Sequence, residues 1–289
     1  VTWIEKKEDS QINHKFIKVK ELRRMKYETI ITKIQDTVQV LKMNRPEKLN
    51  AWNPLMGREL KDAIVQANKD EDITAIVISG EGRGFCAGAD IDGFFKKKSE
   101  GKEVENSNIM TDWVKLIRKS KPTVAAVNGA AIGVGLTKIL PMDFLVASEE
   151  AKLSMRFSKM GLVPELASSH FLVTRVGFGN ASEIMLSGRT LLANEAKELG
   201  LIDRVTNREN LMDEAIYYAK SMGDNPQISI KHIKELLTIN GSESNIDLIQ
   251  KREQEALQEC YKTEEHKEAI SSFIEKREPD FKSARLKNK

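Results

Sequence analysis

The stretch KPTVAAVNGAAIGVG, residues 121–135, is the clearest indication of how this chain folds. Its proline ends a preceding helical pattern, and TVAAVNG then has the unbroken apolar and β-branched character of a short buried strand. The glycine-rich AAIGVG that follows changes into a helical pattern at LTKIL. A strand, a glycine-rich turn and a helix in this order predict an α/β architecture with crossover connections.

The same alternation continues on both sides of this stretch. Two β-branched runs around a polar break predict a hairpin over residues 27–44, Asn53-Pro54 opens a helical pattern, and ITAIVISG at 73–80 reads as a buried strand. After Ser182 the pattern is nearly all helical. We therefore expect an accessory arm at 1–26, an α/β core at 27–205 and a helical region at 206–289.

Composition excludes several classes of protein. A net charge of +3 over 289 residues is too small for a nucleic-acid-binding surface. The two cysteines and four histidines are dispersed, which predicts neither a disulfide framework nor a metal site, and favours a cytoplasmic location. No apolar run approaches the roughly 18 residues of a membrane-spanning helix. The polar, basic residues 1–26 lack the apolar segment of a secretory signal.

Five segments, in order, resemble the crotonase (enoyl-CoA hydratase/isomerase) superfamily over about residues 27–281. They are NRPEKLNA (44–51), GFCAGADI (84–91), KPTVAAVNGAAIGVG (121–135), SGRTLLANEAKELGLIDRV (187–205) and FIEKREPDF (273–281). The resemblance implies a spiral of ββα units with a C-terminal helical trimerisation region, and hence a homotrimer or hexamer. It also implies an acyl-CoA substrate, a role in fatty acid β-oxidation, and no cofactor other than the CoA of the substrate.

The resemblance also implies an oxyanion hole made by two backbone amides, those of Ala89 in CAGAD and Val134 in GVG. Such preorganised donors stabilise negative charge on a thioester oxygen. Glycines allow the backbone to approach a ligand closely, and the GVG segment lies where a strand becomes a helix, at the positive end of the helix dipole. Read alone, these glycines fit ordinary tight turns equally well.

Residues for binding CoA carry over in the same way. The implied set is Lys48, Leu49, Ala51, Ala87, Asp90, Ile91 and Lys276. For Lys276, a solvated helix face is an equally good interpretation.

The two catalytic glutamates of the hydratases are both missing. Thr137 and Phe157 stand at their positions, and neither side chain can activate water. Instead, RFSKMGLVPE at 156–165 resembles the peroxisomal type of Δ3,Δ2-enoyl-CoA isomerase, whose sole base is the glutamate that ends this segment. The resemblance therefore implies that Glu165 is the catalytic base. Without that pattern, Glu165 also fits an ordinary acid in the first turn of a helix.

One base suffices to move a double bond, so the expected activity is that of an isomerase. Other crotonase reactions on a CoA thioester, such as hydration or thioester hydrolysis, remain open because fold does not determine chemistry. A catalytically silent acyl-CoA-binding homologue is the remaining alternative.

Overall fold

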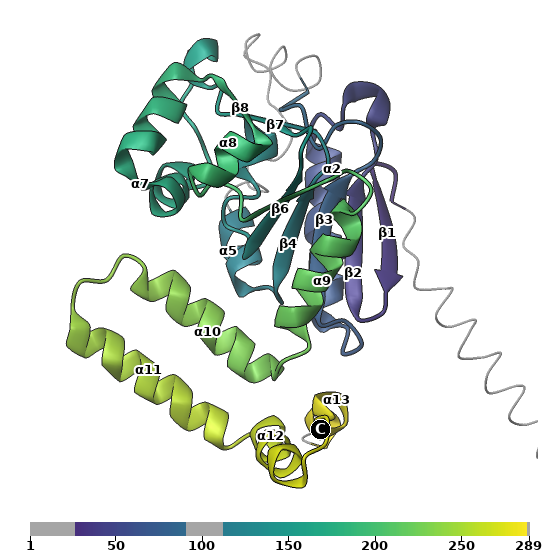
Figure 1. Ribbon diagram of the computed structural model, residues 1–289, viewed down its shortest axis with the longest axis vertical. Helices are drawn as coiled ribbons and strands as arrows, with labels where there is room; N and C mark the ends of the chain where they lie inside the picture. Colours follow the sequence, from purple (N-terminus) through teal and green to yellow (C-terminus); the bar gives the residue numbers. More distant parts are fainter. Residues whose placement is uncertain (1–26, 91–111, 288–289) are drawn as a thin grey trace, which may run out of the picture.

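The computed structural model describes residues 27–90 and 112–287 and shows an α/β core followed by helices (Figure 1). The main sheet has the strand order β1-β2-β3-β4-β6-β9; β1 is antiparallel to β2 and the other neighbours are parallel. A second sheet has the order β5-β7-β8. The strands are β1 (Ile30–Gln35), β2 (Val38–Met43), β3 (Ala75–Gly80), β4 (Thr123–Val127), β5 (Ala130–Ile132), β6 (Phe144–Ser148), β7 (Lys152–Ser154), β8 (Thr190–Leu192) and β9 (Arg204–Thr206).

Both faces of the main sheet are covered. Along β3, Ile76 and Ile78 point into a large apolar cluster that contains the buried face of helix α2 (Pro54–Lys69). Ala75 and Val77 point into a second cluster on the opposite face, which helix α9 (Leu211–Gly223) closes (Figure 1). Burial on both faces explains why this strand reads as a continuous apolar run.

Helices surround this core. Those in the first two thirds of the described chain are η1 (Pro46–Lys48), α2, α5 (Trp113–Lys119), α6 (Val134–Thr137), η3 (Ser158–Met160), α7 (Ser168–Ser187) and α8 (Ala193–Glu198). After α9 come α10 (Gln227–Asn240), α11 (Ile246–Tyr261), α12 (Glu264–Glu275) and α13 (Phe281–Leu286). Figure 1 shows α10 to α13 extending away from the lower end of the sheet.

The structure confirms the predicted α/β fold with a C-terminal helical region, and it corrects one detail. The stretch after Ser182, expected to be nearly all helical, contains the short strands β8 and β9. A three-residue strand shows too little periodicity to be recognised in a sequence. In addition, α9 belongs to the predicted helical region but packs against the sheet as part of the core.

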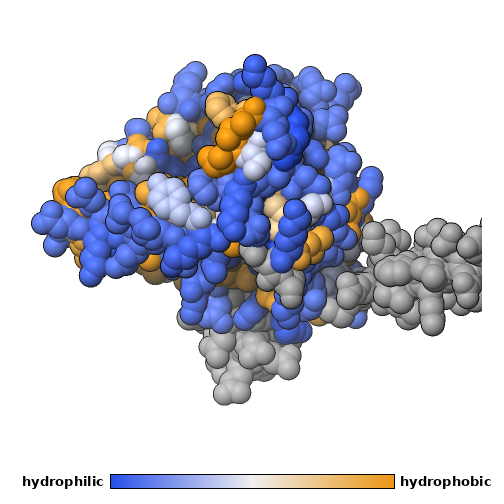
Figure 2. Space-filling view, turned by 90° about the horizontal axis from the view of Figure 1, so that it is seen from below, coloured by the Kyte–Doolittle hydropathy of each residue, from blue (hydrophilic) through white to orange (hydrophobic). Residues whose placement is uncertain are grey.

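The C-terminal helices expose apolar side chains. Viewed from below, the surface is mainly hydrophilic with separate hydrophobic patches (Figure 2). Phe273 and Ile274 on α12 are 84% and 71% exposed, and Leu237 on α10 is 66% exposed. No helix in the described ranges is long and apolar enough to cross a membrane.

Candidate active site

Two glycine-rich loops are held together at the centre of the molecule. The Cys86 amide donates to the Ala130 carbonyl at 2.8 Å, and the Ile132 amide donates to the Cys86 carbonyl at 2.9 Å. Gly135 permits this approach, because a Cβ there would lie 2.2 Å from the Cys86 carbonyl oxygen. The CAGAD loop and the first turn of α6 are therefore locked side by side.

The two amides predicted to form an oxyanion hole belong to these loops. Ala89 forms a parallel bridge with Trp52, in which the hydrogen bonds are made by the Gly88 carbonyl and the Asp90 amide. The Ala89 amide is thus not used by the bridge. Val134 is the first residue of α6, where amides have no acceptor within the helix. Within residues 27–90 and 112–287, neither amide donates to another backbone group.

Glu165 is brought to this site by an unusual turn. Leu166 and Ala167, which follow it, have φ values of 58° and 53°, in the left-handed region that non-glycine residues rarely adopt. The turn directs the Glu165 carboxylate to α6, where the Thr137 hydroxyl donates to its Oε1 at 2.7 Å. The Thr137 hydroxyl that holds Glu165 is therefore one helical turn along α6 from Val134.

Burial sets the chemistry of this carboxyl. It raises the pKa of Glu165 above its ordinary value, and the hydrogen bond from Thr137 acts in the opposite direction. A carboxylate with a raised pKa is a stronger base than one in water. Phe157 adds to the apolar surroundings: its Cζ lies 3.8 Å from where a Cβ on Gly133 would stand.

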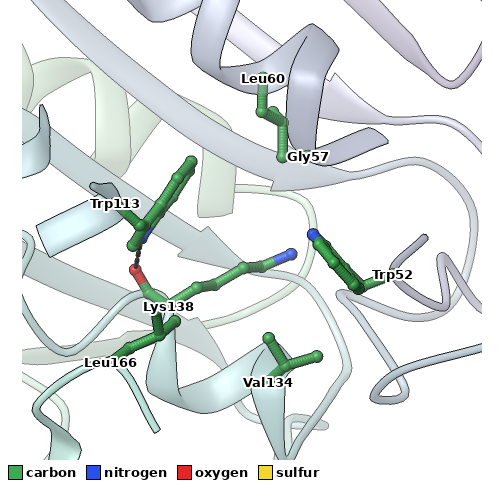
Figure 3. Close-up of a pocket in the computed structure, with 7 residues that line it drawn as sticks. All are labelled: Trp52, Gly57, Leu60, Trp113, Val134, Lys138 and Leu166. Carbon is green, nitrogen blue, oxygen red and sulfur yellow. Dashed lines mark hydrogen bonds between the residues drawn. The ribbon is translucent and has the colours of Figure 1, made fainter. Parts of the chain in front are cut away.

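A small cavity of about 10 Å³, room for roughly one water molecule, opens beside these groups. Val134 and Leu166 form part of its wall, so it adjoins both the α6 amide and the Glu165 turn. The other residues that line it are Trp52, Gly57, Leu60, Trp113 and Lys138 (Figure 3).

Comparisons with known proteins identify the family. Residues 33–284 match the family model described as enoyl-CoA hydratase/isomerase. The chain belongs to this family. It is therefore an acyl-CoA-processing enzyme of the crotonase superfamily.

The relatives that follow each match 87–89% of this chain. A 1,2-epoxyphenylacetyl-CoA isomerase from Escherichia coli K12 is 33% identical over 261 residues, which are 88% of this chain and 98% of the relative. A crotonyl-CoA hydratase from Syntrophomonas wolfei is 31% identical over 89% of this chain and 99% of its own. The crystal structure of an enoyl-CoA hydratase from Polaromonas sp. JS666 superposes with a TM-score of 0.81 at 28% identity, over 87% and 98% of the two chains.

Most of the residues predicted to bind CoA in this enoyl-CoA hydratase/isomerase family member lie together. The Ala87 amide donates to the Leu49 carbonyl at 3.0 Å. Asp90 is buried and accepts from Arg45 at 2.7 Å and from Lys48 at 3.3 Å. Arg45 also donates to the Ala51 carbonyl at 2.6 Å. The Asp90 carboxylate therefore braces the two loops.

Two predicted CoA-binding residues do not join this group. Lys276 follows the last residue of α12 and has the left-handed conformation. In Figure 1, α12 lies below the lower end of the main sheet, whereas Lys48 follows the upper end of β2. Ile91 lies outside the described residues.

Sequence reasoning missed the role of Thr137 and every residue of the cavity wall except Val134. Thr137 was expected only as a residue that cannot activate water, whereas its hydroxyl donates to Glu165. For Lys138, the available signal was its place as the sole charged residue in the run LTKIL, because a lysine between apolar residues can be buried with them.

Proposed function

We propose that this enzyme is a Δ3,Δ2-enoyl-CoA isomerase in which Glu165 is the sole acid/base group. The observation that carries the proposal is the half-buried Glu165 carboxylate, which Thr137 holds at α6, the helix that begins with the Val134 amide. Thr137 and Phe157 occupy the positions of the hydratase glutamates, so a second carboxylate is missing where water activation needs it.

The residues account for each step of the reaction. The Ala89 and Val134 amides bind the thioester oxygen, and Glu165 removes a proton from C2 of a 3-enoyl-CoA. The electron pair of the broken C–H bond moves onto the oxygen, giving a dienolate that the two amides stabilise. Protonated Glu165 then returns the proton to C4 as the double bond forms between C2 and C3. Glu165 ends the cycle ionised, as it began.

The supporting features are the position and the surroundings of the base. A carboxyl with a raised pKa can both take and return a proton near neutral pH. Phe157 beside Gly133 gives apolar contact where a hydratase needs a polar group to hold water. The proposal also includes a cytoplasmic location, a role in β-oxidation, and the use of CoA only as part of the substrate.

Hydration is the second candidate, because relatives such as the Syntrophomonas wolfei protein carry the name hydratase. It would require Glu165 alone to activate water. Another relative is named an isomerase of an epoxide-bearing CoA thioester, so isomerisation is also represented among similar chains. The two reactions give different products, a 3-hydroxyacyl thioester or a conjugated 2-enoyl thioester.

The test is to incubate the enzyme with a trans-3-enoyl-CoA and follow the conjugated 2-enoyl thioester by absorbance. We expect Glu165→Gln to lower the rate by about 10²–10⁴-fold, the usual contribution of a general base. Affinity for a saturated acyl-CoA should be unchanged. Glu198→Gln, at an exposed position on α8, is the matched control and should keep full activity. Turnover retained in Glu165→Gln would remove the assignment, and formation of 3-hydroxyacyl-CoA from a 2-enoyl-CoA would favour hydration.

We also propose that the enzyme is a homotrimer or a pair of trimers assembled through the C-terminal helices. The support is the exposed apolar side chains of Leu237, Phe273 and Ile274, which an interface would cover. Sedimentation equilibrium of the wild type and of Phe273→Glu tests this: a monomeric wild type would contradict it.

A further inference from the structure

Lys138 is a buried lysine at the wall of the cavity. It is 3% exposed, and the Trp113 indole donates to its backbone carbonyl at 2.8 Å, which fixes its place at the end of α6. Its side chain runs through the core, with Nζ 2.7 Å from the Met43 sulfur and 5.6 Å from the centre of the Phe85 ring.

This lysine has no counter-charge in the described part of the chain. The salt bridges of residues 27–90 and 112–287 include none from Lys138. The side chains that its amine meets there are the Met43 thioether and the Cys86 thiol, and both sulfurs are only weak acceptors. The other buried lysine, Lys234, lies 2.6 Å from the Asp143 carboxylate. Burial lowers the pKa of the Lys138 amine, so its charge is expensive to keep. A methionine or leucine would fill the site at a lower free energy, and the lysine therefore needs another explanation.

The position of Lys138 supplies one. It shares the cavity wall with Val134, whose amide is assigned to the thioester oxygen, and with Leu166, next to the base. In Figure 3 the Lys138 side chain crosses the cavity, and its Nζ and the indole nitrogen of Trp52 are turned toward each other. The remaining wall, from Gly57, Leu60 and Trp113, is carbon-rich. The cavity holds roughly one water molecule, so its walls must move apart for an acyl chain to enter. A chain that leaves the Val134 amide in this direction then meets an amine.

We propose that Lys138 is a specificity residue that binds a carboxylate at the far end of the acyl group, so that the preferred substrates are half-thioesters of short dicarboxylic acids. This inference uses one part of the proposed function, that the thioester oxygen binds the Val134 amide and the acyl group therefore enters the cavity beside it. A carboxylate is the complement of this site for two reasons. It supplies the missing counter-charge, and in apolar surroundings a charge-assisted hydrogen bond is roughly twice as strong as a neutral one. It also accepts hydrogen bonds from more than one donor. A neutral ether or ketone oxygen, in contrast, would leave the ammonium charge unbalanced.

The experiment measures binding of saturated thioesters, which have no double bond to move. Succinyl-CoA, glutaryl-CoA and adipoyl-CoA are compared by calorimetry with butyryl-CoA, pentanoyl-CoA and hexanoyl-CoA, on the wild type and on Lys138→Met. Lys138→Gln, which keeps a donor without the charge, is a second variant. Lys197→Met removes one charge from an exposed position on α8 and controls for long-range electrostatics. Thermal melting verifies that each variant is folded.

We expect one of the dicarboxylyl thioesters to bind wild type at least tenfold more tightly than the alkyl thioester of equal chain length. Lys138→Met should reverse this preference, Lys138→Gln should abolish most of it, and Lys197→Met should leave it unchanged. If wild type binds the alkyl thioesters as tightly at every length, or if the preference survives in Lys138→Met, the inference is wrong. Because no proton transfer is measured, this result is independent of the isomerase assay on Glu165.

Discussion

Thr137 and Glu165 are 28 residues apart in the chain, and the Thr137 hydroxyl donates a 2.7 Å hydrogen bond to the Glu165 carboxylate. Thr137 is fully buried at the end of α6, and Glu165 precedes two residues with positive φ. A hydrogen bond between them joins the element that carries one oxyanion amide to the turn that carries the base. In the proposed mechanism Thr137 is therefore a positioning residue, which fixes the orientation of the Glu165 carboxylate.

Replacement of Thr137 by valine should affect the base without removing it. The hydroxyl favours the ionised carboxyl, so its loss should raise the pKa of Glu165 further and shift the acid limb of the pH–rate profile to higher pH. Because hydrogen bonds to charged groups contribute about 1.5–3 kcal/mol, we expect kcat/KM at neutral pH to fall by about tenfold or more. Thr137→Ser keeps the hydroxyl and should restore the wild-type profile. A profile that falls in height without moving would indicate a purely structural role.

The direction in which wild-type activity and stability change with pH follows from the burial of Glu165. Glu165 acts as a carboxylate, and its pKa lies above 4.5, so kcat/KM should rise with pH through that raised pKa. In contrast, the same ionisation should lower stability, since the folded state holds this proton more tightly than the unfolded chain. Glu165→Gln should therefore melt at a higher temperature than wild type at pH 7, with the difference vanishing below the unfolded pKa. Equal melting temperatures at pH 7 would contradict the assigned burial.

Gly135→Ala should destabilise the enzyme and reduce activity. An added Cβ would lie 2.2 Å from the Cys86 carbonyl oxygen, so the two loops of the oxyanion site must separate. We expect a loss of about 1–3 kcal/mol in the free energy of unfolding, as for other overpacked positions. Gly179→Ala, on α7 with no atom within 4 Å of the added Cβ, should be neutral or slightly stabilising. Urea unfolding of both variants measures the contrast, and equal stabilities would refute the close-approach argument.

Asp143 should be essential for attaching α10 to the core. Its carboxylate accepts from Lys234 at 2.6 Å, from Arg118 at 2.9 Å and from the Thr123 amide at 2.7 Å. Removing one partner of a buried ion pair leaves the other uncompensated, at a cost of about 3–5 kcal/mol. Asp143→Ala should lose about this much stability in urea unfolding, and Asp143→Ala/Lys234→Met should recover part of the loss. An additive double variant would show that the two residues are not coupled.

Local signals predicted much of the main sheet because they act over a few residues. The apolar run of β3 and the Asn53-Pro54 start of α2 appear as expected, and the Asn53 side chain accepts from the Met56 amide at 2.8 Å. The strands β8 and β9 were missed because three residues carry no periodicity, and their pairing partners lie elsewhere in the chain.

The sequence by itself determined the family, the order of the longer strands and helices, and the glycines that permit the loops to meet. Those features depend on residue type at fixed local spacing. Only the tertiary structure decided that Thr137 bonds to Glu165 and that Lys138 is buried without a carboxylate in the described chain. Both are contacts or burial states created by segments distant in sequence, and a lysine between apolar neighbours reads the same whether it ends in water or in a cavity.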